Sequence, residues 1–382
     1  MKLAFLAKWA SIHTVRWVNE FAHQGHEVHL LTAHRTGERL DSSVKIHILP
    51  FRPPLGYYLN VPFVRKRLRA IVPNLLNVHY ASGYGTLGRL SEFHPLVLSV
   101  WGSDVYDYPY KSRSNLKRVV KNLRAADWIC STSEAMACQA RKLAPEIVNM
   151  SITPFGVDPN IFRPATGGED SSLTDPECIT IGTVKALAPK YGTDVMIRAV
   201  KEVVARLKSE PVAKEPRLRL LIVGDGPQRK EMEDLVDETG LRTITEFTGH
   251  VVHQEVPRYL NQLDIYVAAS RSDSESFGVA VLEASACGVP VVVSNVGGLP
   301  EVVENGRTGF VVERENPHAV ADVILKLVRD PSLRSSMGRA GRDFVMRRYS
   351  WAQSARIMEQ VYRHVIERST NRVVEVPKCG IL

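Results

Sequence analysis

IYVAASRSDSESFGVAVLEASACGVPVVVS, residues 265–294, contains two short apolar runs separated by a polar turn and a helical segment. The runs 265–268 and 291–294 have the length and composition of buried strands. Between them, a helix is expected over residues 279–287, ending at Gly288. A strand, a helix and a second strand in this order predict two parallel strands joined by a crossover.

Short apolar runs recur along the whole chain, with helical segments between them. This alternation predicts an α/β protein with two Rossmann-like, doubly wound parallel sheets. Ligands bind such folds in the cleft at the carboxyl ends of the strands. The expected strands are Leu3–Ala7, Glu27–Thr32, Lys45–Leu49, Leu75–His79, Leu96–Trp101 and Trp128–Ser131 in the first half, and Ile179–Val184, Arg219–Val223, Thr245–Phe247, Ile265–Ala268, Val289–Ser294 and Phe310–Val312 in the second.

The length of 382 residues is too great for one ordinary core and indicates two domains. Pro164–Pro176 is rich in Gly, Ser and acidic residues and is expected to be the linker. We therefore expect a first domain over residues 1–165 and a second over residues 166–348. For the helix expected within residues 349–382 two alternatives stay open: it crosses back to the first domain, or it ends the second.

The composition, with 44% hydrophobic and 24% charged residues, is that of a soluble globular protein. No apolar run approaches the roughly 18 residues that a membrane span needs, and Lys2–Ala7 is too short for a signal peptide. The five cysteines show no paired spacing, so neither a disulfide framework nor a zinc site is expected. A cytoplasmic location is the simplest expectation.

The net charge of +8 is unevenly distributed. Residues 1–165 contain 21 Lys and Arg against 11 Asp and Glu, whereas the remainder contains 28 against 30. Two basic segments, 61–72 and 111–124, hold much of this excess, and the first contains Arg65, Lys66, Arg67 and Arg69. Basic amphipathic helices lie on anionic membrane surfaces, although a solvated basic surface is the plainer alternative. Nucleic acid is not expected, because neither segment interleaves aromatic residues for base stacking.

Glu275 and Glu283 are the first candidates for chemistry. Glu275 lies in the polar turn before the expected helix, and Glu283 lies within that helix. A helix N-terminus offers free N–H groups to a phosphate, and a carboxylate accepts hydrogen bonds from paired sugar hydroxyls. Lys185 and Lys190 follow another expected strand and could neutralise a departing diphosphate. Taken alone, the glutamates could equally lie on a solvated helix face, and the lysines are more simply explained as solvated surface residues.

The segment from Glu275 to Glu283 resembles the E-x7-E signature of retaining glycosyltransferases of family 4, which have the two-domain GT-B fold. Further motifs resemble that family in order and spacing, so the resemblance covers nearly the whole chain. These motifs are Arg16-Trp17, Gly25-His26-Glu27-Val28, Trp101-Gly102-Ser103-Asp104, Pro154-Phe-Gly156-Val157-Asp158, Lys190-Tyr191-Gly192, Val223-Gly224-Asp225-Gly226-Pro227 and Gly249-His250-Val251.

The resemblance implies a donor site in the second half of the chain. Glu275 would hold hydroxyls of the transferred sugar, and Glu283 would hold the ribose of the nucleotide. Lys185 stands where the family usually has arginine, which keeps the charge but loses the bidentate fork. The donor-binding residues implied in this way are Glu283, Phe277, Gly278, Val279, Gly249, His250, Val251 and Gly224.

The first half departs from the family in two places. After its first strand the family often has a Gly-rich loop, where this chain has Lys8-Trp-Ala-Ser-Ile-His13. Where the family often has a histidine, this chain has Trp101, which cannot transfer a proton. Asp104 is the first candidate for that role, followed by His13 and His79. Asp104 could instead cap the following helix, and His79 could be a structural residue at a strand end.

Gly83-Tyr-Gly85-Thr-Leu-Gly88 matches the dinucleotide-binding fingerprint G-x-G-x-x-G. That fingerprint normally occupies the opening βα turn of its domain, whereas this one comes several strands later. We therefore expect a glycine-rich loop on the acceptor side and no dinucleotide site.

Together these features predict a hexosyltransferase-type glycosyltransferase of the retaining class. Its donor would be a nucleotide sugar, with uridine as the expected base, and its acceptor a glycan or a lipid-linked sugar in polysaccharide or glycoconjugate biosynthesis, at the inner membrane face. No cofactor or metal ion is expected, because no D-x-D motif is present and Lys185 and Lys190 supply positive charge. Two alternatives are a sugar-nucleotide epimerase of the same fold and a non-catalytic nucleotide-sugar-binding scaffold.

Overall fold

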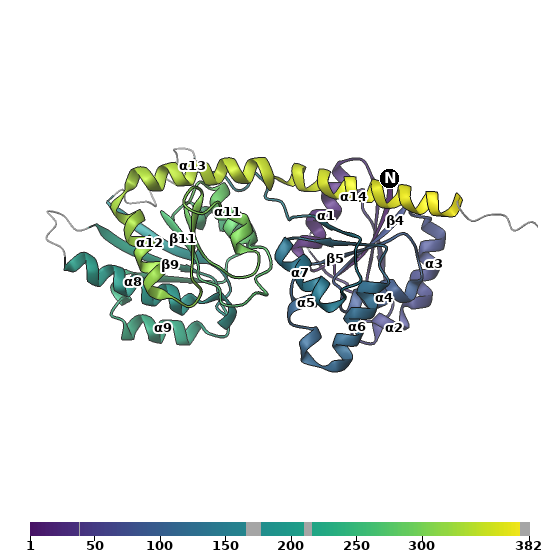
Figure 1. Cartoon of the computed structure of the whole chain (residues 1–382), viewed down its shortest axis with the longest axis horizontal. Helices are drawn as coiled ribbons and strands as arrows, with labels where there is room; N and C mark the ends of the chain where they lie inside the picture. Colours follow the sequence, from purple (N-terminus) through teal and green to yellow (C-terminus); the bar gives the residue numbers. More distant parts are fainter. Residues whose placement is uncertain (38, 166–176, 210–215, 375–382) are drawn as a thin grey trace, which may run out of the picture. The chain divides into compact units, whose positions relative to one another are not determined.

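The chain forms two compact units (Figure 1). The computed structural model describes residues 1–37, 39–165, 177–209 and 216–374, with side chains to residue 371. Unit 1 contains residues 1–155 and helix α14 (Trp351–Val374), and unit 2 contains residues 156–350. Unit 1 thus ends before the expected residue 165. Val157 already belongs to unit 2, where its backbone N–H donates a 2.7 Å bond to the carbonyl of Tyr349. Most of the expected linker, residues 166–176, lies outside the described residues.

Unit 1 contains a seven-stranded parallel sheet in the order β3-β2-β1-β4-β5-β6-β7. All six predicted strands are present, and their ends lie within one residue of the expected ones. β7 was not predicted, since its three residues are only half-buried and include a serine. The strands are β1 (Lys2–Leu6), β2 (Glu27–Thr32), β3 (Lys45–Ile48), β4 (Leu75–His79), β5 (Leu96–Val100), β6 (Trp128–Ser131) and β7 (Met150–Ile152).

Helices cover both faces of this sheet. On one face Leu76 of β4 shares a core with Leu68 of α3 and Leu123 of α6. On the other face Asn77 of β4 donates a hydrogen bond to the hydroxyl of Tyr362 in α14, whose ring packs against Phe21 of α1. The helices are α1 (Ile12–His23), α2 (Gly56–Leu59), α3 (Val61–Ile71), α4 (Gly83–Ser91), α5 (Ser103–Tyr106), α6 (Arg113–Arg124), α7 (Glu134–Leu143) and α14.

Unit 2 contains a six-stranded parallel sheet in the order β10-β9-β8-β11-β12-β13. All six strands predicted for the second half are present, and neighbouring strands pair in parallel throughout. Two doubly wound parallel sheets, the expected fold class, are thus confirmed. The strands are β8 (Cys178–Val184), β9 (Arg217–Val223), β10 (Thr245–Gly249), β11 (Ile265–Ala268), β12 (Val291–Ser294) and β13 (Gly309–Val312).

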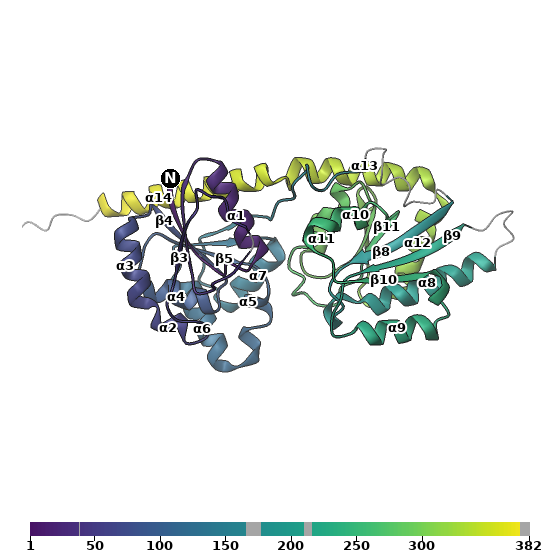
Figure 2. The ribbon, with the colours of Figure 1, turned by 180° about the vertical axis from the view of Figure 1, so that it is seen from behind.

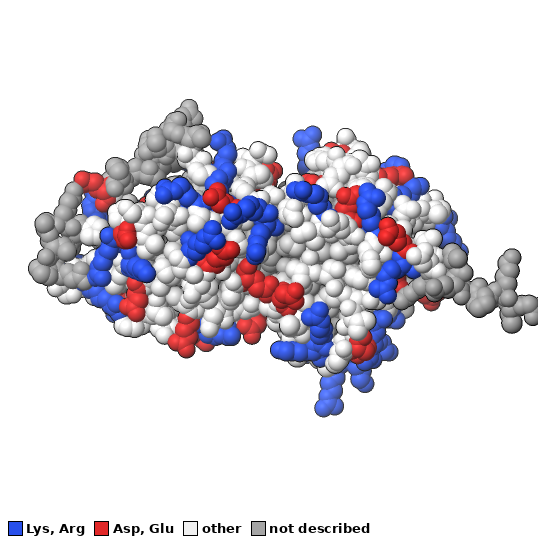
Figure 3. Space-filling view, turned by 45° about the horizontal axis from the view of Figure 1, so that its top comes forward, with Lys and Arg blue, Asp and Glu red and all other residues white. Residues whose placement is uncertain are grey.

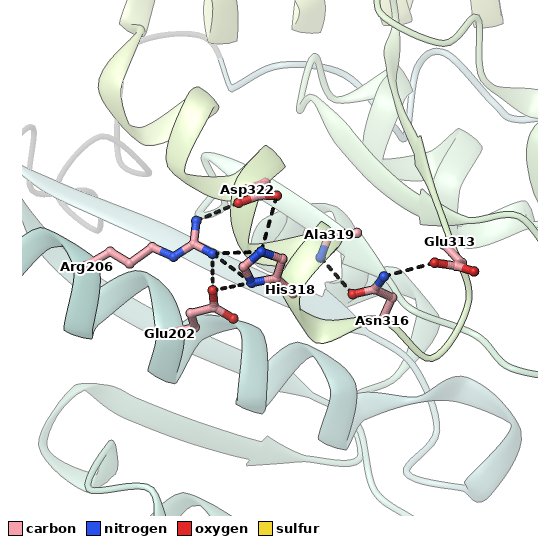
Figure 4. Close-up of polar contacts among 7 residues, drawn as sticks. All are labelled: Glu202, Arg206, Glu313, Asn316, His318, Ala319 and Asp322. Atoms are coloured by element: carbon pink, nitrogen blue, oxygen red, sulfur yellow. Dashed lines mark hydrogen bonds and ion pairs between the residues drawn. The ribbon is translucent and has the colours of Figure 1, made fainter.

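Helices α8, α9 and α12 lie on one face of this sheet, and α10 and α11 lie on the other (Figure 2). Helices α8 and α12 are joined by an exposed polar network, in which Arg206 contacts Glu202, His318 and Asp322 (Figure 4). The helices are α8 (Thr193–Lys208), α9 (Arg229–Glu238), α10 (Val256–Leu260), α11 (Val279–Ala286), α12 (Pro317–Arg329) and α13 (Pro331–Arg348).

The last helix, α14, packs on unit 1. Its first residue, Trp351, contacts Trp17 of α1 edge to face, with ring centroids 5.0 Å apart. Farther along, Tyr362 is fully buried against β4 and α1. Unit 1 is therefore built from both ends of the chain, and unit 2 is inserted between them.

The basic helix α3 uses its apolar face in the core. Val64, Leu68 and Ile71 are buried, whereas Lys66 and Arg67 are exposed. The basic side chains of α3 thus lie on its solvent side, together with half-exposed Phe63, so both alternatives for this segment, a membrane-binding surface and a solvated basic surface, stay open. No helix in the described part of the chain is long and apolar enough to cross a membrane. Four cysteines are free thiols, and Cys379 lies outside the described residues: Cys130, Cys138, Cys178 and Cys287.

Candidate active site

Lys185 and Glu275 form an ion pair at the carboxyl edge of the unit 2 sheet. Lys185 directly follows β8, and Glu275 lies in the turn after the neighbouring strand β11. Lys185 Nζ is 2.9 Å from Glu275 Oε1, and the side chains are 20% and 9% exposed. Burial alone would lower the pKa of Lys185, but the charge of Glu275, the nearby Tyr266 and Tyr191 and the hydrogen bond to Glu275 together outweigh it and raise this pKa above its usual value. The lysine is therefore held as a cation in a largely water-excluded place.

A second cation lies beside this pair. The Nζ atoms of Lys185 and Lys190 are each 4.8 Å from the centroid of the Tyr191 ring, a cation–π distance. Lys190 and Tyr191 belong to a short 3₁₀ turn, whose position is fixed by a 2.8 Å bond from the N–H of Arg271 to the carbonyl of Lys190. The structure thus brings the two predicted lysines together around one aromatic ring next to Glu275.

Two glycines allow the loops to approach these strand ends closely. Gly192 has φ of +62°, and a Cβ there would lie 1.9 Å from the carbonyl oxygen of Ala269. Gly224 has φ of +136°, and a Cβ there would lie 2.0 Å from the carbonyl oxygen of Lys185. Only glycine tolerates both the conformation and the contact. Gly224 is therefore required for the close packing of its loop against the backbone of Lys185.

The turn that carries Glu275 leads into helix α11. The N-cap of this helix is Gly278, which has a left-handed conformation and no side chain with which to cap the first turn. The next two residues, Val279 and Ala280, are half-buried, and the first N–H groups of a helix have no partner within it. Sequence reasoning missed Gly297 and Gly298 on the far side of the turn. A Cβ at either would lie 2.2 Å from a backbone oxygen of Glu275 or Ser276, and the pair of glycines after β12 was the available signal.

Glu283, in the same helix, is paired with a residue that the sequence did not indicate. His253 Nε2 lies 3.1 Å from Glu283 Oε1, and the imidazole also packs edge to face against Phe162. Glu283 is only 6% exposed, so the histidine holds a carboxylate that has little other access to water. His253 follows the predicted Gly249-His250-Val251 segment in the sequence, and that segment was the nearest sequence signal for it.

The predicted base-side segment follows β10. Gly249 ends this strand with φ of +75°, and its carbonyl accepts a 3.0 Å bond from the N–H of Gly224. His250 is exposed and Val251 is half-buried. The candidate residues thus follow four adjacent strands, β10, β9, β8 and β11, at the edge where ligands bind in doubly wound sheets.

In unit 1 the acceptor-side candidates belong to an aromatic cluster. Trp101 follows β5 and contacts His79, at 4.2 Å between centroids, and His13, at 5.8 Å. His13 in turn stacks on Phe155 at 4.1 Å. His79 is buried, its Nδ1 lies 3.2 Å from the hydroxyl of Thr14, and burial together with nearby His13 lowers its pKa to about 3. His79 is therefore neutral at neutral pH and favours the structural interpretation.

Asp104 binds backbone in its own loop. Its Oδ2 accepts a 2.7 Å bond from the N–H of Ala81, and its Oδ1 accepts bonds from the N–H groups of Trp101 and Gly102. The carboxyl group is fully buried, which raises its pKa, while these backbone bonds oppose the rise. This geometry favours the structural alternative for Asp104, because both oxygens already hold the strand ends of β4 and β5 together.

Two family models match the chain. "Glycosyl transferase 4-like" matches residues 2–133, and "Glycosyl transferases group 1" matches residues 169–344. The first match covers β1–β6 of unit 1, and the second covers every strand of the unit 2 sheet. The chain is a glycosyltransferase of the family 4 type.

Individual proteins agree with this assignment. The GDP-mannose-dependent α-(1-6)-phosphatidylinositol monomannoside mannosyltransferase of Mycolicibacterium smegmatis is 29% identical over 327 residues, 81% of this chain and 82% of that protein. Sucrose-phosphate synthase from Thermosynechococcus elongatus superposes with a TM-score of 0.78 at 20% identity, over 96% of this chain and 100% of that chain. HepE from Anabaena in complex with UDP-glucose does so with a TM-score of 0.74 at 18% identity, over 97% and 100%. The glycosyltransferase therefore has the GT-B fold.

The G-x-G-x-x-G segment of the glycosyltransferase is not a loop. Its three glycines lie within helix α4, and they are needed for close packing. A Cβ at Gly83 would overlap the Tyr57 ring at 2.2 Å, and one at Gly88 would meet Val78 at 2.6 Å. The expectation of a glycine-rich loop here was wrong, because side-chain packing in a helix can demand the same spacing as a phosphate-binding turn.

Proposed function

We propose that this glycosyltransferase moves a hexose from a nucleoside-diphosphate sugar to a glycan or lipid-linked acceptor, with retention of anomeric configuration. The observation that carries the proposal is the Lys185–Glu275 pair, whose carboxylate lies in the turn that leads into α11. A buried cation next to a carboxylate offers charge to a diphosphate and acceptor oxygens to sugar hydroxyls. The M. smegmatis relative uses GDP-mannose by its name, and HepE binds UDP-glucose, which supports a nucleotide sugar as the donor class.

Within this proposal each part of the donor has a binding group. Lys185 and Lys190 neutralise the diphosphate, together with backbone N–H groups at the start of α11. Glu275 accepts hydrogen bonds from hydroxyls of the transferred sugar. Glu283, oriented by His253, accepts those of the ribose. The base, for which we propose uracil, lies beside the Gly249-His250-Val251 segment.

The proposed transfer needs no nucleophile from the protein. The bond between the anomeric carbon and the diphosphate oxygen breaks, and the acceptor oxygen bonds to the same face of the sugar. The acceptor proton passes to the departing diphosphate, whose charge the two lysines stabilise. This route requires no proton transfer by Trp101 or Asp104. The carboxylate of Asp104 can therefore keep its hydrogen bonds with the backbone. We propose that Lys185 and Lys190 serve in place of a metal ion.

We further propose that the acceptor is met at an anionic membrane surface. Lys66, Arg67 and Arg69 of α3 are exposed, whereas Arg65 is paired with Glu92 at 2.7 Å. Exposed cations near a membrane each contribute on the order of 1 kcal/mol of attraction to anionic lipid. The M. smegmatis relative acts on a phosphatidylinositol mannoside by its name, which supports a lipid-linked acceptor.

The test is to incubate the protein with radiolabelled UDP- and GDP-sugars and a membrane lipid extract. Label that moves to lipid or glycan supports transfer. A changed nucleotide sugar without acceptor points to an epimerase, and binding without turnover points to a scaffold. Glu275→Gln is expected to abolish transfer, while Glu238→Gln, an exposed carboxylate on α9, is the matched control. Full activity in Glu275→Gln would contradict the proposed site.

A further inference from the structure

A pocket of about 460 Å³ lies among α2, α4 and α6 of unit 1, apart from the residues described above. Tyr58 and Ser114 form part of its wall, and no acidic side chain belongs to the described lining. Figure 3 shows Lys and Arg side chains gathered along the lower edge of unit 1, where Figure 1 places α6. Five cationic side chains line the pocket: Arg89, Arg113, Lys117, Arg118 and Lys121.

The cations on α6 are arranged along one side of the helix. Arg113, Lys117 and Lys121 are spaced four residues apart, which places them above one another on a single face. Like charges at this spacing destabilise a helix when nothing neutralises them. Within the described residues no carboxylate forms an ion pair with any of the three. An anion in the pocket would remove this repulsion.

Two of the three arginines, Arg89 and Arg118, are held in place by neutral groups. Arg89 Nε donates a 2.9 Å bond to Oδ1 of Asn122, a side chain that is 1% exposed. Asn122 is fixed in turn, because its Nδ2 donates 2.9 Å bonds to the carbonyl of Ala81 and the hydroxyl of Thr86. Arg118 is bonded to Tyr108 and Asn115. These partners orient the guanidinium groups without cancelling their charge.

Other cations of unit 1 have a different environment. Arg65 lines the neighbouring pocket between α3 and α4, but it is paired there with Glu92 at 2.7 Å. Arg124, one turn beyond Lys121, is paired with Glu146. Carboxylates thus neutralise Arg65 and Arg124, whereas the described lining of the α6 pocket contains five cations and no carboxylate.

We propose that this pocket is a binding site for a phosphate-bearing group, either a phosphate monoester or a diphosphate. Oriented guanidinium forks match phosphate oxygens bidentately, and lysines add point charges around them. The volume is enough for a phosphorylated headgroup or a small phosphorylated solute. The inference does not depend on the proposed function, because it rests on side chains of unit 1 alone.

The test is calorimetric titration of the full chain with inorganic pyrophosphate. Lys117→Gln with Lys121→Gln is expected to weaken binding roughly tenfold or more. Lys66→Gln with Arg67→Gln removes the same charge from α3 and is expected to leave binding unchanged. Equal weakening by both pairs would mean diffuse attraction and would overturn the proposal. The proposal would also be overturned if Lys185→Gln weakened binding and Lys117→Gln/Lys121→Gln did not, because pyrophosphate would then bind only at the donor site.

Vesicles distinguish the two sources of the phosphate. Phosphatidylcholine vesicles containing phosphatidic acid, a monoester, are compared with vesicles containing phosphatidylglycerol at equal surface charge. A preference for phosphatidic acid that is lost in Lys117→Gln/Lys121→Gln supports a lipid headgroup as the ligand. Pyrophosphate binding without such a preference supports a soluble phosphate compound. The substitutions on α3 and α6 are exposed, whereas Lys185 is largely buried, and circular dichroism checks that every variant folds.

Discussion

Lys185 forms an ion pair with Glu275, and this pair affects how the lysine can bind a donor diphosphate. A donor diphosphate would compete with Glu275 for the same ammonium group. Arginine, which the family usually has here, can contact a carboxylate and a phosphate together through its five N–H donors. Lysine has to divide three donors between them.

We predict that Lys185→Met lowers the transfer rate by roughly a hundredfold or more, because charge stabilisation of the leaving group is lost. Lys185→Arg is expected to retain most of the activity. Initial rates with a saturating nucleotide sugar measure both effects. Lys230→Met, an exposed lysine on α9, is the control and is expected to change nothing. A Lys185→Met enzyme with an unaltered rate would remove the lysine from the mechanism.

The Glu283–His253 pair predicts an effect on donor binding. We expect His253→Ala to raise KM for the nucleotide sugar by about tenfold, since Glu283 loses the group that orients it. The turnover number should change little, because the ribose is remote from the reacting bond. Steady-state kinetics with varied donor give both constants. A fall in kcat at constant KM would assign His253 a different role.

His79 gives the protein a pH-dependent stability. Its pKa is about 3 when folded and 6.5 when exposed, so between these values the unfolded chain binds a proton that the folded chain does not. The contribution is complete above pH 6.5 and is lost as the pH falls, by about 1.4 kcal/mol per unit. Urea unfolding of wild type and His79→Gln should therefore show a shallower pH slope for the variant in this range. Parallel slopes would contradict the burial argument.

At the scale of elements, α14 attaches to unit 1 through several buried side chains, of which Tyr362 is the largest. Tyr362 is fully buried, so Tyr362→Ala should destabilise the protein by about 3–5 kcal/mol through the cavity that it leaves. Tyr362→Phe removes only the hydrogen bond with Asn77 and should cost about 1 kcal/mol. Denaturant titrations compare the two variants. Similar small losses in both would mean that α14 detaches without affecting the core.

The elements themselves could be predicted because apolar runs reveal buried strands wherever both faces of the strand are covered. β7 escaped prediction since it is half-buried and short, so hydrophobicity carries little signal there. The helical glycines of α4 were mistaken for a loop because a sequence motif does not show whether a glycine serves a turn or a close side-chain contact.

Side-chain pairings could not be predicted. Lys185 and Glu275 were both identified, yet they are 90 residues apart and only the adjacency of β8 and β11 brings them together. His253 lies 30 residues from Glu283 and has no motif of its own. Asp104 was expected to act in catalysis, while its three backbone bonds depend on the fold of two neighbouring loops.

At the scale of the whole molecule, the positive charge is concentrated in residues 1–165, which are largely unit 1. We predict that the protein sediments with vesicles rich in anionic lipid at low salt and is released as ionic strength rises, since screening shortens the reach of surface charges. Lys66→Gln/Arg67→Gln should lower the bound fraction. Lys201→Gln/Lys230→Gln in unit 2 removes equal charge and should not. Salt-independent binding would point instead to insertion of apolar side chains.

The insertion of unit 2 between the two parts of unit 1 sets an order for synthesis on the ribosome. Residues 156–350 emerge together and contain every strand of their own sheet, so they can fold while the chain is still growing. The sheet of residues 1–155 emerges first, yet the face that α1 covers lacks the rest of its cover until α14 leaves the exit tunnel. During that interval the apolar surface around Phe21 and Asn77 is open to chaperones. In a chain truncated before Tyr362, this apolar surface would stay exposed after synthesis.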